Sequence, residues 1–323
     1  MNRTKMVILD GYTLNPGDLS WDELGRLGEL DLYDRTEPYQ IVERTQDAEI
    51  ILTNKAPIST ETLDQLPKLK FISVTGTGYN MVDISAAGRR GIPVSNVPEY
   101  GTDSVAQFAF ALLLELCHQA GFHDRAVKAG DWSAAPDWCF WETPQLLLAG
   151  KKMGIVGFGR IGRRVGELAH AFGMEVMAFD PEQRETPAYS PFHWKRLQDL
   201  FAEADVVTLH CPQTAENIGF INHDLLNSMK KDAFFINAAR GGLVNENDLA
   251  KALNTETIAG AAVDVVSNEP IQLDNPLLTA SNCLITPHIA WASLDARQSM
   301  MKTTVKNIRA FLSGRPINVV NGS

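Results

Sequence analysis

The sequence has little of what marks membrane, secreted or nucleic-acid-binding proteins. It contains no run of about 18 apolar residues, so no transmembrane helix is predicted. Its first residues include a short apolar run without a small-residue cleavage site, which favours a first strand over a signal peptide. Lys and Arg number 29 against 39 Asp and Glu, and no basic run occurs, which argues against a nucleic-acid partner. With a net charge of −10, the protein would have to bind an anionic ligand through local donors.

Cysteine is also scarce. The four cysteines lack the spacing of a metal site or of a disulfide framework: Cys117, Cys139, Cys211 and Cys283. We therefore expect reduced thiols, no metal ion and a cytoplasmic location. The chain of 323 residues, 45% of them hydrophobic, is long enough for two domains with a core each.

The segment 157–162, GFGRIG, stands in the context of a nucleotide-binding turn. It follows an apolar run at 152–156 that predicts a buried strand, and it opens a helical pattern at 163–172. A second strand-like run, 175–179, leads into Asp180. The glycines alone could form a mere tight turn. A strand, a glycine turn, a helix and an acidic strand end within about 30 residues are typical of a dinucleotide-binding unit.

Each glycine has its own task in such a unit. Gly157 allows the tight turn, Gly159 lets the backbone approach a pyrophosphate, and Gly162 lets the helix pack close to the strand. The helix N-terminus adds N–H donors and the positive end of the helix dipole. Asp180 can accept hydrogen bonds from ribose hydroxyls and would repel a 2′-phosphate, which predicts NAD(H) as the cofactor. Arg184 lies nearby and could soften this preference.

Short runs rich in Val and Ile alternate with helical patterns through most of the chain. The predicted strands are 6–10, 49–54, 71–76 and 93–96, then 152–157, 175–180, 206–210, 233–238, 261–266 and 283–286. Such alternation predicts an α/β fold with two doubly wound parallel-sheet domains. The six later strands match the number in a complete Rossmann sheet.

Two helices determine the predicted domain boundaries. A long apolar helix is predicted at 104–128, either crossing between the domains into a subunit interface or buried within one domain. The last helix, 293–313, precedes a tail that we expect to return to the first domain. We therefore predict a flavodoxin-like substrate (catalytic) domain of residues 1–100 plus 293–323. The NAD-binding Rossmann domain, residues 101–292, is inserted into it.

Three polar residues follow three of the late strands, namely Arg240, Glu269 and His288. Because ligands of doubly wound sheets bind beyond the carboxyl ends of the strands, we expect all three near the nicotinamide half of a dinucleotide. Taken singly, a strand-end Arg is more often in a surface ion pair, and a lone His more often structural. Together they fit hydride transfer to a 2-keto acid, since Arg can grip a carboxylate and a carbonyl, His can exchange a proton, and Glu can stabilise the charged imidazole.

With these residues in place, the chain resembles the D-isomer-specific 2-hydroxyacid dehydrogenases over nearly its whole length. The matching segments are VTGTGYNMVDI at 74–84, GTDSVAQFAFALLLEL at 101–116, GIVGFGRIG at 154–162, LHCPQT at 209–214, INAARGGLV at 236–244, AGAAVDVVSNEP at 259–270 and TPHIAWAS at 286–293. The resemblance implies a homodimer with a cleft between two domains. The family's NTARG or NTSRG is replaced here by NAARG, which changes no chemistry.

The resemblance also implies residue roles. Arg240 would bind the substrate carboxylate and carbonyl, Glu269 would pair with His288, and His288 would be the acid/base. The turn Gly76-Thr77-Gly78 would hold the substrate carboxylate with its N–H groups, and Lys55 would flank the substrate. Asp264 would bond the nicotinamide carboxamide. The implied cofactor-binding residues are Ser104, Gly157, Gly159, Arg160, Ile161, Gly162, Asp180, His210, Cys211, Pro212, Thr214, Ala238, Arg240, Asp264 and His288.

Three segments resemble the hydroxypyruvate-reductase (D-glycerate dehydrogenase) branch: 53–59, 130–141 and 285–293. They imply NADH-dependent reduction of hydroxypyruvate to D-glycerate, and of glyoxylate to glycolate. Alternatives are another acid of the family (D-lactate or 3-phosphoglycerate), or an NAD(H)-sensing binding protein of the corepressor type. The segment 130–144 is rich in tryptophan, and Trp141 either lines the partner's pocket or packs in the interface.

Overall fold

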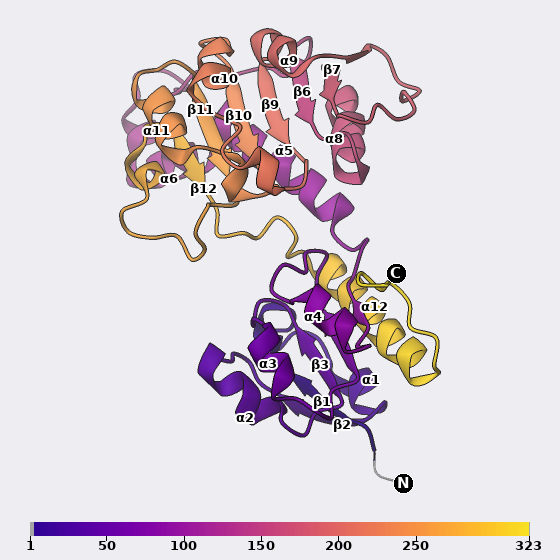
Figure 1. Cartoon of the computed structure of the whole chain (residues 1–323). Helices are drawn as coiled ribbons and strands as arrows, with labels where there is room; N and C mark the ends of the chain where they lie inside the picture. Colours follow the sequence, from indigo (N-terminus) through magenta and orange to yellow (C-terminus); the bar gives the residue numbers. More distant parts are fainter. Residues whose placement is uncertain (1–2, 323) are drawn as a thin grey trace. The chain divides into compact units, whose positions relative to one another are not determined.

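The computed structural model describes residues 3–322 and divides into two compact units (Figure 1). Unit 1 runs up to Gly101 and resumes at Ala292, and unit 2 is Thr102–Trp291. Each unit is a parallel sheet with helices on both faces, so the α/β fold with two doubly wound sheets is confirmed.

Unit 1 is built on a five-stranded sheet in the order β2-β1-β3-β4-β5, the flavodoxin-like order in which the chain starts near one edge and reverses. Its strands are β1 (Lys5–Ile8), β2 (Glu29–Leu32), β3 (Ile50–Thr53), β4 (Phe71–Val74) and β5 (Val94–Ser95). Its helices are α1 (Asp22–Gly25), α2 (Ile41–Thr45), α3 (Thr60–Asp64), α4 (Ile84–Arg89) and α12 (Leu294–Leu312). β3 and β4 are buried at every position, which explains their continuous apolar sequences.

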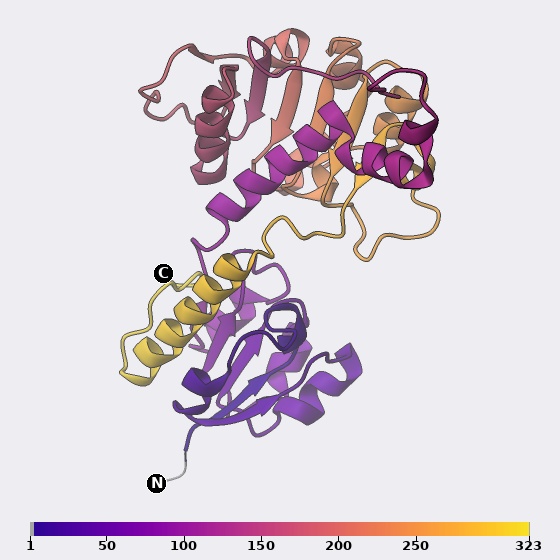
Figure 2. The same cartoon turned by 180° about the vertical axis from the view of Figure 1, so that it is seen from behind.

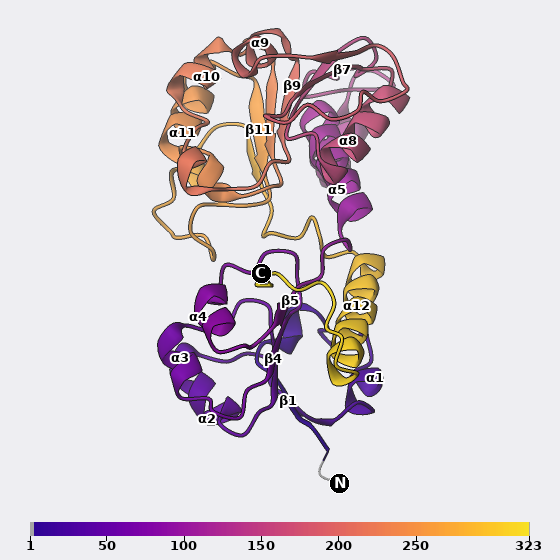
Figure 3. The same ribbon diagram turned by 45° about the vertical axis from the view of Figure 1, so that its right-hand side comes forward.

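Helices cover both faces of this sheet (Figure 3). One core lies among β1, β3, β4 and the helices α2, α3 and α4. On the opposite face α12 packs against β4, where the rings of Phe71 and Phe311 stack with centroids 4.5 Å apart. The tail after α12 runs along β5, since Val320 donates its N–H to the Val94 carbonyl at 2.8 Å.

Unit 2 is built on a seven-stranded sheet in the order β12-β11-β10-β9-β6-β7-β8. Its strands are β6 (Lys152–Val156), β7 (Glu175–Phe179), β8 (Phe192–Trp194), β9 (Val206–Leu209), β10 (Phe234–Asn237), β11 (Gly260–Val263) and β12 (Cys283–Ile285). Its helices are α5 (Thr102–His118), α6 (Ala120–Ala129), α7 (Asp131–Ala134), α8 (Arg160–Ala171), α9 (Leu197–Glu203), α10 (His223–Ser228) and α11 (Glu246–Asn254). The order is that of a Rossmann sheet with one additional strand.

Two cores lie on the two faces of the unit 2 sheet. One is formed with α9, α10 and α11, and the other with α5 and α8. Figure 2 shows α5 lying across the face that it covers. Because every strand is parallel, the carboxyl ends of β10, β11 and β12 lie side by side at one edge of the sheet.

The structure corrects three details of the sequence predictions. The helix predicted at 104–128 is two helices, because Gln119 adopts a left-handed conformation with φ 44°, which ends α5 and turns the chain by 50° into α6. The edge strands β2 and β8 were not predicted. Edge strands have one neighbour and bury less, so their sequences lack a continuous apolar run.

Within residues 3–322, no single helix is long and apolar enough to cross a membrane. Among the helices of the described residues, α5 and α6 reach that length and composition when taken together with the bend between them.

Candidate active site

The glycine turn after β6 has the geometry that a dinucleotide needs. Gly157 has φ +91°, and a Cβ there would lie 2.5 Å from the backbone N of Cys211. A Cβ on Gly162 would lie 2.1 Å from the Gly157 carbonyl oxygen, so α8 can approach the turn only with glycine there. Gly159, in contrast, has nothing within 4 Å of its Cβ position. Two glycines are therefore required by the protein's own packing, and the third leaves open space.

The space next to Gly159 fits a pyrophosphate. Gly159 is the N-cap of α8 and provides no side-chain cap, so the first turn of the helix presents its N–H groups and dipole to this space. Arg160 and Ile161 begin that turn. The residues present thus fit the diphosphate of a dinucleotide.

Asp180 lies at the end of β7, beside the glycine turn. Its Oδ2 accepts a hydrogen bond from the Phe158 N–H at 2.8 Å, and its Oδ1 accepts one from the Glu182 N–H at 3.1 Å. The carboxylate therefore braces the turn. A carboxylate has about four acceptor positions, so two remain for ribose hydroxyls.

The segment His210–Thr214 follows β9 and packs against two other loops of the site. The His210 N–H donates to the Val156 carbonyl at 2.7 Å, which places Cys211 against Gly157. Farther along, Gln213 lies so close to Gly242 that a Cβ on this glycine would be 2.6 Å from its Oε1. Pro212 and Thr214 are both held by the side chain of Asn217, at 2.9 and 2.7 Å.

The side chains of this segment are uncharged at neutral pH. The Nε2 of His210 lies 3.0 Å from Thr208 Oγ1, while its Nδ1 is shielded from solvent and has no partner among the described residues. Burial lowers the pKa of His210 to about 3. Burial also raises the pKa of the Cys211 thiol to about 11.

Arg240 is held by a buried asparagine at the end of β10. Asn237 donates from Nδ2 to the Arg240 carbonyl at 2.9 Å and accepts at Oδ1 from the Ala239 N–H at 3.0 Å. These two bonds fix the loop that contains Ala238 and Arg240. The guanidinium is exposed, and its Nη1 donates to the Ala239 carbonyl at 2.7 Å.

The loop of Arg240 also packs tightly against the chain that leads to Glu269. A Cβ on Gly241 would lie 1.9 Å from the carbonyl carbon of Val266. Only glycine allows this approach, so the spacing of Arg240 and Glu269 is set by backbone contact.

His288 and Glu269 form a close pair. The Nδ1 of His288 lies 2.7 Å from Glu269 Oε2, and both side chains are about one-third exposed, at 29% and 32%. The carboxylate fixes the orientation of the ring, and Nε2 is the atom left for proton exchange with a ligand.

The backbone of His288 has the left-handed conformation, with φ 55°, which is costly for a residue with a Cβ. Asp264, only 1% exposed, holds it in place. Its carboxylate accepts hydrogen bonds from the Thr286 hydroxyl at 2.7 Å and from the N–H groups of Ile289 and Ala290 at 2.9 and 2.8 Å. Asp264 therefore braces the loop of His288, a role that sequence reasoning missed because no spacing rule reveals it.

Ser104, near the start of α5, supports the same loop. Its hydroxyl donates to the Ala290 carbonyl at 2.7 Å. All the predicted residues from 104 to 288 thus belong to unit 2, in the segments that follow its strands or in the first turns of α5 and α8, and Asn237 is added to them.

The remaining predicted residues belong to unit 1 and lie at the carboxyl edge of its sheet. Lys55 follows β3 and is exposed, and the turn Gly76-Thr77-Gly78 follows β4, the neighbouring strand. The turn and Lys55 therefore extend from the same edge of one sheet.

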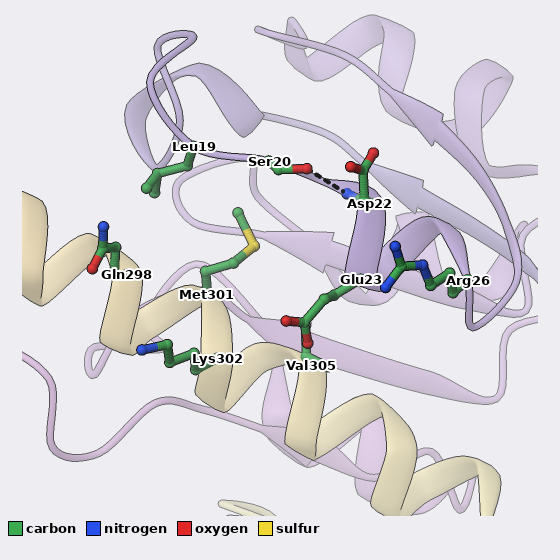
Figure 4. A pocket seen from close by; sticks show the side chains of 9 residues that line it. All are labelled: Leu19, Ser20, Asp22, Glu23, Arg26, Gln298, Met301, Lys302 and Val305. Atoms are coloured by element: carbon green, nitrogen blue, oxygen red, sulfur yellow. Dashed lines mark hydrogen bonds between the residues drawn. The ribbon is translucent and has the colours of Figure 1, made fainter.

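A groove of about 310 Å³ opens between α1 and α12 of unit 1 (Figure 4). Acidic, basic and apolar side chains line it together, among them Asp22, Glu23, Arg26, Met301 and Lys302. It contains none of the predicted site residues. Across residues 3–322, no group of three or more His, Cys, Asp or Glu side chains is placed to hold a metal ion.

The tryptophan-rich segment of unit 2 is largely exposed. Trp132, Trp138 and Trp141 are 51%, 86% and 67% exposed, and the Trp132 indole N–H donates to the Trp138 carbonyl at 3.0 Å. Exposed aromatic side chains grouped in this way are typical of surfaces that bind another molecule.

The chain is similar to known proteins over nearly its whole length. Residues 110–290 match the family model described as "D-isomer specific 2-hydroxyacid dehydrogenase, NAD binding domain". The chain is 47% identical to a hydroxypyruvate reductase from Blautia hydrogenotrophica over 320 residues, 98% of this chain and 99% of the relative. It is 38% identical to a glycerate dehydrogenase from Methylorubrum extorquens, covering 98% of each chain.

A solved structure with a similar fold is the NADPH-dependent glyoxylate/hydroxypyruvate reductase from Sinorhizobium meliloti, in complex with NADP and malonate. It superposes with a TM-score of 0.84 at 28% identity, over 99% of this chain and 97% of the other.

Proposed function

Because the chain belongs to the D-isomer specific 2-hydroxyacid dehydrogenase family, an NAD(P)-dependent group of oxidoreductases, we propose that it reduces hydroxypyruvate to D-glycerate with NADH. Glyoxylate, reduced to glycolate, is the proposed second substrate. The names of the two relatives reported above support this choice of acid.

The observation that carries the proposal is the pair of His288 and Glu269, whose Nδ1 and Oε2 atoms are 2.7 Å apart. A histidine that is fixed by a carboxylate at one nitrogen can deliver a proton from the other. Glu269 and His288 follow the carboxyl ends of β11 and β12, and Arg240 follows the carboxyl end of the neighbouring strand β10.

Substrate binding is assigned to donors that suit a 2-keto acid. Arg240 presents a planar guanidinium that can bond the carboxylate and the adjacent carbonyl oxygen together, which a lysine could do less well. The N–H groups of the turn Gly76-Thr77-Gly78 are proposed as further donors to the carboxylate, and Lys55 as a nearby positive charge.

Proton transfer is assigned to His288. In the direction of reduction, protonated His288 donates from Nε2 to the carbonyl oxygen of the keto acid, and Glu269 stabilises the imidazolium before the transfer. NADH, when bound at the glycine turn, supplies the hydride that reduces C2. Asp264 and Ser104 hold the loop of His288 so that the donor nitrogen stays in place.

We propose NADH and not NADPH because Asp180 ends β7 beside the glycine turn. Its carboxylate would repel the 2′-phosphate of NADPH and can accept bonds from the free hydroxyls of the NADH ribose. The reductase from Sinorhizobium meliloti is NADPH-dependent, and the test of the function below therefore compares NADH with NADPH.

We also propose a homodimer, in which unit 2 binds the cofactor and unit 1 supplies the turn Gly76-Thr77-Gly78 and Lys55 for the substrate. The exposed Trp132, Trp138 and Trp141 support a second copy covering this segment. Sedimentation of the wild type and of Trp141→Ala tests the dimer. Unchanged relative rates across substrates in a monomeric Trp141→Ala would rule out a place for Trp141 in the pocket.

The test of the function is the rate of NADH oxidation with hydroxypyruvate, glyoxylate, pyruvate and 3-phosphohydroxypyruvate, each repeated with NADPH. We expect the highest kcat/KM with hydroxypyruvate and NADH. A preference for another acid would keep the mechanism and change the substrate. Tight NADH binding without turnover of any acid would instead favour an NAD(H)-sensing role.

A further inference from the structure

The turn Gly76-Thr77-Gly78 of unit 1 is held in place by hydrogen bonds to three successive carbonyl groups, which begin at Thr75, the residue before the turn. The Thr75 carbonyl accepts a bond from Asn54 Nδ2 at 2.6 Å, and the Thr77 carbonyl accepts one from Asn96 Nδ2 at 2.8 Å. Between them, the Gly76 carbonyl accepts the Val97 N–H at 2.9 Å.

The N–H groups of the same turn have no such partners. Within residues 3–322, no hydrogen bond to the N–H groups of Gly76, Thr77 or Gly78 is formed. Three successive carbonyls are thus satisfied by the protein, and three successive N–H groups are left for an anion. The side chains of Asn54 and Asn96, which bond two of these carbonyls, therefore help to determine the direction in which the N–H groups of the turn point.

Asn54 is itself fixed by a carboxylate. Asp10 follows β1, and its oxygens accept bonds from three successive N–H groups, those of Asn54 at 2.8 Å, Lys55 at 2.5 Å and Ala56 at 2.8 Å. Hydrogen bonds to a charged acceptor are stronger than neutral ones. This arrangement fixes the backbone of the segment that includes Lys55, and with it the side chain of Asn54.

The other side of the turn is fixed independently. Asn307 of α12 is fully buried and donates from Nδ2 to the Asn96 carbonyl at 2.9 Å. Asn318 of the tail donates to Asn307 Oδ1 at 2.8 Å. Loss of the contacts on one side should therefore loosen the turn without unfolding it.

We propose that Asp10 is a positioning residue for the substrate carboxylate. It acts through Asn54, which ties down the Thr75 carbonyl so that the N–H groups of the turn point at the ligand. This inference rests on the proposed function of the turn. Asp10 itself does not touch the substrate.

The test compares Asp10→Asn with the wild type. The substitution keeps the shape of the side chain. However, the NH2 group of the new amide is a donor, and it would lie where a carboxylate oxygen of Asp10 now accepts hydrogen bonds from backbone N–H groups. We expect KM for the preferred 2-keto acid to rise about tenfold, kcat to change by less than about threefold, and the Kd of NADH to stay the same. A loss of folded protein would lower the apparent kcat and leave KM unchanged, so this split separates positioning from stability.

Two further variants sharpen the test. Asn54→Ala removes the bond to Thr75 but leaves its own N–H, so it should raise KM to a similar extent. If Asp10 acts through Asn54, the double variant should be no worse than either single one. Asn54→Ala also provides the test should Asp10→Asn fail to fold. Asp47→Asn is the matched control, because Asp47 lies in the same unit in an exposed ion pair with Lys68 and should change nothing.

The inference can also be tested without measuring turnover, by determining the Kd of oxalate by calorimetry in the presence of NADH. We expect the Kd of oxalate to be about tenfold higher in folded Asp10→Asn. Equal KM and equal oxalate affinity would overturn the inference while the proposed function stands. Wild-type protein that binds oxalate but reduces no acid would contradict the proposed function alone. Wild-type protein that does not bind oxalate would overturn the inference.

Discussion

The Nδ1 of His288 lies 2.7 Å from Glu269 Oε2, and this contact joins the ends of two neighbouring strands. His288 reaches Glu269 with its backbone in the left-handed region, at φ 55°. Such a conformation costs about 1–3 kcal/mol and persists only where the surroundings impose it. Here Asp264 imposes it through three hydrogen bonds to the same loop.

Replacing His288 by Asn should remove the proton donor and keep a residue that tolerates a left-handed backbone. We expect kcat to fall by about 10²–10⁴-fold, the usual contribution of a general acid, with the Kd of NADH within about threefold of the wild type. Steady-state kinetics measure kcat, and a fluorescence titration with NADH measures its Kd. His223→Asn, at an exposed position, is the control. Equal losses of kcat and of NADH affinity would mean that His288 has a structural role.

Replacing Glu269 by Gln should slow the reduction without weakening the binding of NADH. The carboxylate orients the His288 ring through its contact with Nδ1, and a neutral amide of the same shape does so less firmly. We expect kcat to fall by about 10–100-fold, with the Kd of NADH unchanged. Steady-state kinetics and a fluorescence titration with NADH measure the two quantities, with the exposed Glu256→Gln as the control. An unchanged kcat would contradict the proposed role.

Gly241→Ala tests the contact between the loop of Arg240 and the chain that leads to Glu269. The added Cβ would lie 1.9 Å from the carbonyl carbon of Val266, so the loop has to move. We expect kcat/KM for the keto acid to fall about 100-fold, as a shift of about 1 Å in a positioned group can cause. Gly25→Ala, where nothing lies within 4 Å of the Cβ position, is the control. Full activity of Gly241→Ala would show that the packing does not fix Arg240.

Asp180→Asn tests the cofactor assignment. The amide keeps an oxygen that can accept from the Phe158 N–H, but it removes the charge that would repel a 2′-phosphate. We expect the ratio of kcat/KM with NADH to that with NADPH to fall about tenfold or more. The control is Glu182→Gln, two residues farther on. A wild type that already prefers NADPH would show that Asp180 does not select the cofactor.

His210 should make the protein less stable in acid. Its pKa is lowered to about 3 in the folded state, against an ordinary value of about 6.5, so between these two pH values the unfolded chain binds a proton that the folded protein does not. Stability should therefore fall as the pH drops from about 6.5 toward 3, by up to about 1.4 kcal/mol per pH unit from this group. Urea unfolding at several pH values measures the slope. The slope of stability against pH should be smaller in His210→Asn than in the exposed control His118→Asn. Equal slopes in the two variants would contradict the claim that His210 destabilises the protein in acid.

Part of the site could be predicted because its residues are tied to local geometry. Of the three glycines at 157–162, Gly157 and Gly162 correspond to a turn or a close contact and Gly159 leaves open space, and such requirements leave a mark at fixed spacing. Arg240, Glu269 and His288 could be placed together because each follows a strand of a parallel sheet, whose carboxyl ends lie at one edge. Asn237, Asp10 and the bracing role of Asp264 could not be found in this way. Each acts by hydrogen bonds to backbone groups, which any segment of chain provides.

The sequence by itself determined the α/β class, the parallel sheets, the nucleotide-binding turn and the family, because hydrophobic periodicity and glycine spacing follow from local physical requirements. Only the tertiary structure decided where the helix at 104–128 breaks, which short strands complete the sheet edges, and how His288 is held. Gln119 has a side chain that allows a continuous helix, yet its backbone is left-handed, with φ 44°, which its sequence does not reveal. The loop of His288 is likewise set by Asp264, 24 residues earlier, through contacts that exist only after folding.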